Sequence, residues 1–289
     1  MKKKLLFPFF LALASLCSCG GNPASSNTIF VSFYPLEDFA SKIAKGKFEI
    51  ENITPVGMEP HDYEPSAKLI GRMSEGKGFL ANGLEMEHYL SSLPSSLLDK
   101  TLVCSKGVTT IKNDNGIVDP HIWLDPSRAK IMADNIKDFL ISIDRDGASF
   151  YQDNYADIAS KFDTLDAEIK EAVKTFKRKT VVVSHAAFGY LCDAYGLTQK
   201  AIHGLEPSEE PTAATMAEII DAVKKEGITT IFAEEMVSPE IANKIAQETG
   251  AKVEVLSPIE GLEEEDVGKE DYFSIMRDNL AKLKEACCD

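Results

Sequence analysis

The sequence lacks the signature motifs of several large enzyme classes. It contains no HExxH pair, no GxSxG turn around a serine, no P-loop and no GxGxxG turn. The common patterns of zinc peptidases, serine hydrolases, nucleotide hydrolases and dinucleotide-dependent oxidoreductases are therefore absent.

Cysteine is also scarce, and its spacing excludes one class of metal site. Beyond residue 19 the chain has no CxxC pair, and a structural zinc site of the finger type normally needs such pairs. A disulfide from the C-terminal pair to Cys192 is compatible with an oxidising compartment, although the sequence leaves the pairing open. The cysteines in this part of the chain are Cys104, Cys192, Cys287 and Cys288.

Basic residues are outnumbered by acidic ones. The chain has 31 Lys and Arg against 46 Asp and Glu, which gives a formal net charge of −15. Removal of residues 1–18 takes away three lysines and no acidic residue, so the charge becomes −18. Such a chain is a poor partner for nucleic acid or anionic lipid, and it is a plausible collector of cations.

No segment is long and apolar enough to cross a membrane as a stable helix. The apolar run Leu5–Leu16 follows the positive residues Lys2–Lys4, which is typical of a signal peptide, here residues 1–18. Ser18 is a small residue before Cys19, as in a bacterial lipobox. We therefore predict that Cys19 is lipidated; an ordinary signal peptide followed by an unmodified cysteine is the alternative.

This leader predicts where the protein works. Residues 19–27 contain Pro, Ala and Ser and are predicted to be a flexible tether. We expect an extracytoplasmic protein that is anchored by lipid to a bacterial membrane, on the periplasmic or cell-surface side, without a spanning helix.

The rest of the chain alternates short apolar strands with helices, which predicts βαβ units and an α/β fold with mostly parallel sheets. The predicted strands are residues 29–33, 48–53, 78–81, 101–104, 180–184, 199–202, 229–233 and 252–256. The predicted helices are residues 35–45, 66–75, 86–92, 127–143, 149–177, 186–195, 212–226, 239–249 and 272–286.

One predicted helix is much longer than the others. Residues 149–177 contain no glycine or proline, and their apolar residues recur at spacings of three and four. A helix of this length extends roughly 40 Å. We predict that residues 146–178 form a rigid linking helix between two lobes, residues 28–145 and 179–289, and that it limits hinge motion.

One histidine lies in a tightly constrained stretch. His121 belongs to DPHIWLDP, Asp119–Pro126, where it stands between two Asp-Pro steps and beside the only tryptophan. Proline disfavours helix at the residue before it, so His121–Leu124 is predicted to be a buried strand end, with a helix from Pro126. A ligand and a core histidine bonded to a backbone carbonyl are both possible for such a position.

Two further histidines have similar settings. His61 lies in TPVGMEPHDYEP, residues 54–65, whose prolines and glycine reduce the entropy lost on ligand binding. His185 follows the β-branched strand 180–184, and ligands gather at the carboxyl ends of parallel strands. A solvated turn residue is the alternative for His61, and His88 is predicted to be a surface or packing residue.

Together these histidines predict a transition-metal site between the lobes. Neutral imidazoles with a carboxylate suit zinc or another late first-row dication, whereas magnesium and calcium prefer all-oxygen sites. The ligands are too far apart in sequence for a zinc finger.

The motifs GMEPHDYEPS, DPHIWLDP, SHAAFGYL and EPSEEPT closely resemble those of the substrate-binding lipoproteins of zinc/manganese ABC importers, the cluster A-I, zinc-uptake-like family. The resemblance covers essentially the whole chain after the leader. It implies a metal site at His61, His121 and His185, with Zn²⁺ as the transported cargo and Mn²⁺ as an alternative. It also implies an ABC permease and its ATPase as partners, a monomer, and no enzymatic activity.

The fourth ligand departs from the family pattern, which usually has an aspartate shortly before the last helix. Alignment on Tyr272 and Met276 places Glu270 at that position. Asp271, Glu59 and water are competitors for the same role. The acidic run 260–271 is typical of a solvated loop, and entry of one of its members into the site is the alternative.

Two other functions are alternatives to metal import: a zinc hydrolase and a binding protein for a chelated metal. A cell-surface zinc hydrolase would use the same histidines, but it would keep one metal position open for water and need a base beside it. A binding protein for a chelated metal would need an open cleft lined by arginine or aromatic residues, and the motifs offer mostly histidine and small side chains.

Overall fold

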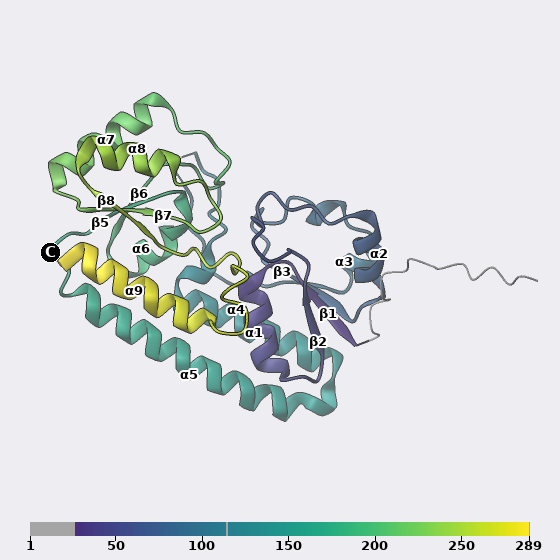
Figure 1. Ribbon diagram of the computed structural model, residues 1–289. Coiled ribbons are helices and arrows are strands. Elements are labelled where there is room, and N and C mark those ends of the chain that lie inside the picture. The colour runs from purple at the N-terminus through teal and green to yellow at the C-terminus, as the bar shows by residue number, and fades with distance from the viewer. Residues whose placement is uncertain (1–26, 114, 289) are drawn as a thin grey trace, which may run out of the picture.

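The computed structural model describes residues 27–113 and 115–288, which form two α/β lobes side by side (Figure 1). Each lobe has a four-stranded parallel sheet, with strand orders β2-β1-β3-β4 and β6-β5-β7-β8. The strands are β1 Thr28–Val31, β2 Glu49–Asn52, β3 Gly78–Ala81, β4 Thr101–Val103, β5 Thr180–Val183, β6 Thr198–Ala201, β7 Thr230–Ala233 and β8 Lys252–Val255. The predicted fold class is confirmed.

The inner strands are the most buried part of each sheet. Strands β1, β3 and β7 are buried along their full length, whereas the edge strands β2, β4, β6 and β8 are half-buried or exposed. Helices cover both faces of a parallel sheet, so side chains on both sides of an inner strand are buried. This is why the inner strands consist of continuous apolar runs. The strands were therefore recognisable from sequence even though they are short.

The helices begin and end largely where local signals place them. The side chain of Ser66 accepts a hydrogen bond from the backbone N–H of Leu69 at the start of α2, and Gly227 ends α7 in the left-handed conformation. The helices are α1 Tyr34–Ala44, α2 Ala67–Glu75, α3 Ser95–Leu98, α4 Pro126–Ile143, α5 Ala148–Val173, α6 Gly189–Tyr195, α7 Ala213–Glu226, α8 Glu240–Thr249 and α9 Tyr272–Cys288.

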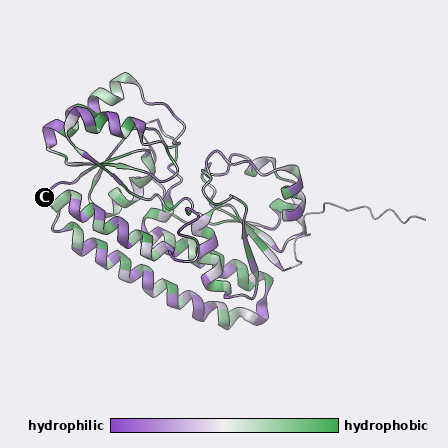
Figure 2. Cartoon of the chain, viewed as in Figure 1, coloured by the Kyte–Doolittle hydropathy of each residue, from purple (hydrophilic) through white to green (hydrophobic). Residues whose placement is uncertain are grey.

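Helix α5 runs beneath both lobes, and α9 lies beside it (Figure 1). Figure 2 shows hydrophobic and hydrophilic residues alternating along both helices, as expected of amphipathic helices that bury one side. Phe39 of α1, Phe162 of α5 and Tyr272 of α9 pack edge to face, with ring centroids 5.0–5.5 Å apart. The linking helix is therefore packed into the protein rather than exposed between the lobes.

The hydrophobic core is shared between the lobes. The largest cluster of buried apolar residues includes Phe39 of the first lobe, Leu165 of α5 and Phe188 of the second lobe, and each lobe adds a smaller cluster of its own. The lobe boundaries predicted at residues 145 and 179 remain a prediction, since the shared cluster extends across both of them.

Two predicted elements are wrong. Residues 86–92 contain only one 3₁₀ turn instead of a helix, because residues 83–85 all have positive φ and the Glu87 carboxylate accepts backbone hydrogen bonds from Asn82 and Gly83. Residues 121–124 are buried as expected, but they form a 3₁₀ turn rather than a strand end.

The predictions about export and membrane attachment concern residues before the first strand. The signal peptide predicted at residues 1–18, the lipidated Cys19 and the tether up to residue 26 lie outside the described residues. In the part of the chain that is described, no helix combines the length and hydrophobicity needed to cross a membrane.

Candidate metal centre

Four buried side chains from four separate segments meet between the lobes. They are His61, His121, His185 and Glu260, and at most 6 % of any of these residues is exposed. His61 comes from the loop after β2, His121 from the turn before α4, His185 from the end of β5, and Glu260 from the loop after β8. The structure thus brings together the three histidines that the sequence singled out.

The ligand atoms of this group are evenly spaced. The Nε2 atom of His121 lies 3.1 Å from that of His61 and 3.2 Å from that of His185. The Oε1 atom of Glu260 lies 3.5, 3.2 and 3.4 Å from the Nε2 atoms of His61, His121 and His185. These distances describe five of the six edges of a tetrahedron.

The size of this tetrahedron matches one metal ion. Zinc bonds to imidazole nitrogen and carboxylate oxygen at about 2.0–2.2 Å, so neighbouring ligand atoms of a tetrahedral zinc site lie about 3.3–3.6 Å apart. The observed edges of 3.1–3.5 Å agree with this range or fall slightly below it. The donor set of three imidazoles and one carboxylate also suits zinc.

Acidic residues hold two of the rings in place. His121 pairs through Nδ1 with the Asp119 carboxylate at 2.7 Å, and His185 pairs through Nδ1 with the Glu234 carboxylate at 2.6 Å. Each carboxylate also accepts the backbone N–H of its histidine, at 2.9 Å in both cases. Because a carboxylate accepts hydrogen bonds, Nδ1–H donates in the neutral ring and the Nε2 lone pair is left for a metal.

Charge at the site follows from burial and from these partners. Burial disfavours the charged form of His185, but Glu260 and Glu234 outweigh it and hold the pKa of His185 well above its usual value. At His121, burial would likewise lower the pKa, but the Asp119 carboxylate outweighs it and the pKa is raised. At His61, burial prevails and the pKa is lowered. The partners thus favour protonation of His121 and His185 in the metal-free site, whereas burial disfavours protonation of His61.

Glu260 is ionised in this setting. Burial alone would raise the pKa of Glu260, but the charge of His185 and the neighbouring imidazoles hold it well below its usual range. Although its carboxylate lies within ion-pair distance of all three rings, neither oxygen has a hydrogen bond of acceptable geometry. The three Nε2 atoms and the Glu260 oxygen lie at similar distances from one another, as donors around one ion would.

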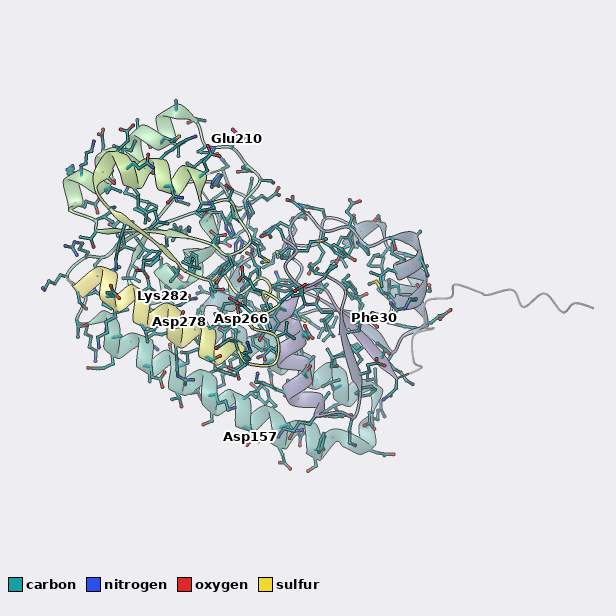
Figure 3. All side chains as sticks on the ribbon, viewed as in Figure 1. Phe30, Asp157, Glu210, Asp266, Asp278 and Lys282 are labelled. Carbon is teal, nitrogen blue, oxygen red and sulfur yellow. The ribbon has the colours of Figure 1, made fainter. Side chains whose placement is uncertain are left out.

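The predicted fourth residue, Glu270, is not part of this group. Glu270 is exposed, and the structure puts Glu260 in its place. The loop that carries Glu260 crosses the junction between the lobes before α9 begins, and Asp266 marks its course in Figure 3. Alignment on Tyr272 fixed the start of the helix correctly but not the path of the loop before it.

The two other protein competitors have different partners. The Asp271 carboxylate accepts the backbone N–H of Ser274 at the start of α9 and lies 3.1 Å from Lys42 Nζ. The Glu59 carboxylate accepts the backbone N–H of His61 at 3.2 Å, and burial together with the negative charge of Glu260 raises the pKa of Glu59 to about 9. Glu59 is therefore neutral near pH 7.

A signal for Glu260 is nevertheless present in the sequence. It follows the last strand, β8, as His185 follows β5, so the rule that ligands gather at the carboxyl ends of parallel strands also applies to it. The supporting residue Glu234 follows β7 in the same manner. Neither carboxylate has a sequence motif that distinguishes it from its acidic neighbours.

The remaining histidines and the cysteines lie outside the group. His88 is exposed, and its Nε2 atom lies 3.2 Å from the Glu206 carboxylate. The Nδ1 atom of His203 pairs with the backbone carbonyl of Glu209 and not with any of the four residues of the centre. None of the four cysteines of the described chain is in a disulfide: Cys104, Cys192, Cys287 and Cys288.

Known proteins with related sequences are named for zinc binding or zinc uptake. The chain is 36% identical to the zinc-binding lipoprotein AdcA of Streptococcus pneumoniae, over 95% of this chain and 60% of that protein. It is 31% identical to the high-affinity zinc uptake system protein ZnuA of Bacillus subtilis, over 97% of this chain and 96% of that protein. The chain thus spans only about three fifths of the pneumococcal relative.

Solved structures show the same architecture. The crystal structure of the Zn(II)-bound ZnuA-like domain of Streptococcus pneumoniae AdcA matches with a TM-score of 0.80 and 36% identity, over 92% of this chain and all of that domain. The laminin-binding protein Lmb of Streptococcus agalactiae, described as an adhesin with metal-transporting activity, matches with a TM-score of 0.84 and 31% identity, over 90% of this chain and 98% of that one.

A family model covers nearly all of the described residues. It is the model of the zinc-uptake complex component A, periplasmic, and it matches residues 29–286. Both lobes, the linking helix and all four residues of the centre lie within this range. The chain therefore belongs to the family of periplasmic component A proteins of zinc-uptake complexes.

Proposed function

We propose that this protein is the extracytoplasmic metal-binding component of an ABC importer, which captures Zn²⁺ and delivers it to a membrane permease. The observation that carries the proposal is the tetrahedral spacing of four buried ligand atoms from His61, His121, His185 and Glu260. The names of the pneumococcal and Bacillus relatives support zinc as the cargo.

The donor set favours zinc over manganese. Manganese prefers oxygen ligands and more than four of them, whereas three imidazoles and one carboxylate suit a tetrahedral zinc ion. The second-lobe ligand, His185, is a nitrogen donor that Glu234 holds in position. Mn²⁺ remains the alternative cargo, with weaker binding expected.

The same arrangement argues against the hydrolase alternative, and we propose that the protein is not an enzyme. A hydrolytic zinc needs an open position for water and a free base beside it. Here Glu260 fills the fourth position. The other carboxyl groups beside the centre are already engaged: Asp119 and Glu234 with the rings of His121 and His185, and Glu59 with the backbone N–H of His61.

Delivery requires the protein to stay close to its permease. We propose that Cys19 carries a lipid anchor and that the partners are an ABC permease and its ATPase. The strongly acidic composition supports a role in collecting cations rather than in binding nucleic acid.

A matched pair of variants tests the site. Glu260→Gln should weaken zinc binding about a hundredfold or more, because the neutral amide is a poor ligand and leaves the ion with three donors. Glu270→Gln removes the same charge ten residues away and should leave the affinity unchanged. Competition with a zinc chelator measures both, and metal analysis should find one zinc per chain. A loss confined to Glu270→Gln would restore the ligand expected from sequence.

Hydrogen exchange tests how zinc acts on the rest of the molecule. Zinc should increase protection in the loops 57–65, 203–212 and 261–271, which surround the centre and have few apolar anchors. Helix α5 should change little, because its inner face is packed into the shared core. The comparison is made with chelator-treated protein, with magnesium as the control ion. Large protection changes along α5 would instead indicate movement of whole lobes.

A further inference from the structure

The residue immediately before Glu260 has a rare backbone conformation. Ile259 has a φ of 58°, in the left-handed region, and its side chain is fully buried. In this region Cβ of an L-residue lies too close to the following carbonyl oxygen, and a branched Cβ makes the conformation still less favourable. Of the four non-glycine residues with positive φ in the described chain, Ile259 is the one that is β-branched.

Trp123 holds this segment from the first lobe. Its indole Nε1–H donates a hydrogen bond of 2.7 Å to the carbonyl oxygen of Pro258. The tryptophan is fully buried, and the hydroxyl of Tyr272 donates to its backbone carbonyl at 2.6 Å. The ring of Trp123 also lies beside the ring of His121, with centroids 5.2 Å apart. One side chain therefore contacts two parts of the metal centre.

Asn279 of α9 holds the same segment from the other side. Its side-chain oxygen accepts the backbone N–H of Ser257 at 2.9 Å, and its amide donates to the carbonyl of Ser257 at 2.7 Å. The hydroxyl of Ser257 in turn accepts the N–H of Ile259 at 3.2 Å. An unfavourable backbone conformation persists only where the surrounding structure imposes it. The hydrogen bonds from Trp123, Asn279 and Ser257 impose the left-handed conformation at Ile259.

Glu260 depends on its backbone more than the other members of the group do. His121 and His185 are held by Asp119 and Glu234, whereas the side-chain partners of the Glu260 carboxylate are the three imidazoles of the centre itself, and none of them forms a hydrogen bond of acceptable geometry with it. Gly261 and Leu262, which follow Glu260, are only half-buried and line two pockets of about 350 and 220 Å³, whereas residues 256–260 are buried. The direction of Glu260 is therefore set by the chain that precedes it.

We propose that Ile259 and Trp123 are positioning residues, which use a left-handed turn at Ile259 to place Glu260 at the metal position before the metal arrives. The proposal rests on the proposed function, because it concerns the same centre. A carboxylate that is already in place loses less entropy on binding than one that must be ordered by the ion. The turn should therefore increase zinc affinity at the expense of stability in the metal-free protein.

Two variants of Ile259 separate these effects. Ile259→Ala and Ile259→Gly both remove the buried side chain, but only glycine adopts positive φ without strain. Without metal, Ile259→Gly should unfold at a temperature a few degrees above that of Ile259→Ala. With zinc, it should bind about tenfold more weakly than Ile259→Ala, because its backbone no longer fixes Glu260. The more stable variant is thus expected to be the weaker binder.

A purely structural role for Ile259 predicts the opposite relation. Affinity would then follow stability, or the two variants would bind zinc equally, and either result would overturn the proposal. The unfolding midpoint without metal and the chelator competition with zinc are measured on the same preparations. If the unaltered protein bound no zinc, the proposed function would fail, while the order of the two metal-free midpoints would still report whether the turn is strained.

A second variant decides the matter if neither Ile259 variant folds. Trp123→Phe keeps an aromatic ring in the core while it removes the donor to Pro258 together with one ring of the indole. It should weaken zinc binding about tenfold and alter the visible absorption of the cobalt(II)-loaded protein, which reports ligand geometry. An unchanged cobalt spectrum together with unchanged zinc affinity would overturn the proposal.

Discussion

His121→Ala should abolish tight zinc binding while the protein remains folded. Zinc sites with four protein ligands bind with apparent free energies of about 10–16 kcal/mol, so one ligand corresponds to roughly 2.5–4 kcal/mol, which is a loss of affinity of about 60- to 700-fold. The loss should be at the upper end of this range, since His121 Nε2 lies within 3.1–3.2 Å of the other three ligand atoms. Chelator competition measures the affinity.

Two other histidines of the chain provide matched controls. His88 and His203 both lie outside the centre, so His88→Ala and His203→Ala should bind zinc with the affinity of the unaltered protein. Circular dichroism of His121→Ala should match that of the controls, because the shared core of apolar residues is untouched. One zinc bound by His121→Ala with unchanged affinity would show that the ion is held elsewhere.

Zinc affinity should fall steeply when the pH is lowered from 8 to 6. The pKa values of His121 and His185 are raised in the metal-free site, so these rings retain protons at and above the usual histidine value of about 6.5. Zinc binds the neutral rings and must displace those protons. With two protons displaced, the affinity falls about a hundredfold per pH unit below the raised pKa values.

The other two ligands should contribute little to this dependence. The pKa of His61 is lowered by burial and that of Glu260 is held well below its usual range, so both are ready to bind the ion near pH 7. Calorimetry in buffers of different ionisation enthalpy should accordingly detect proton release on zinc binding, and the release should increase as the pH is lowered toward the usual histidine value. An affinity that stays constant between pH 8 and pH 6 would contradict a centre built from His121 and His185.

Local signals in the sequence were sufficient for most of the fold. Short apolar runs indicated the inner strands, and a long stretch free of glycine and proline indicated helix α5. Both signals lie in the order of residues along the chain, because a buried strand needs consecutive apolar residues and an amphipathic helix needs apolar residues at spacings of three and four. Three histidines could be selected for a similar reason, since each lies in a distinctive short motif. The segment 86–92 was misassigned because its backbone is bonded by the Glu87 side chain, which helical periodicity does not reveal.

The sequence by itself determined the α/β alternation, the long helix α5 and the three histidines that meet in the candidate centre. Only the tertiary structure decided that the lobes share a core and that Glu260, rather than Glu270, meets the histidines. Both acidic residues lie in one loop and differ little in local sequence. What separates them is a hydrogen bond to Pro258 from Trp123, 135 residues away, and the left-handed turn at Ile259. Contacts over such distances exist only once the chain has folded, and they select the carboxylate that faces the metal.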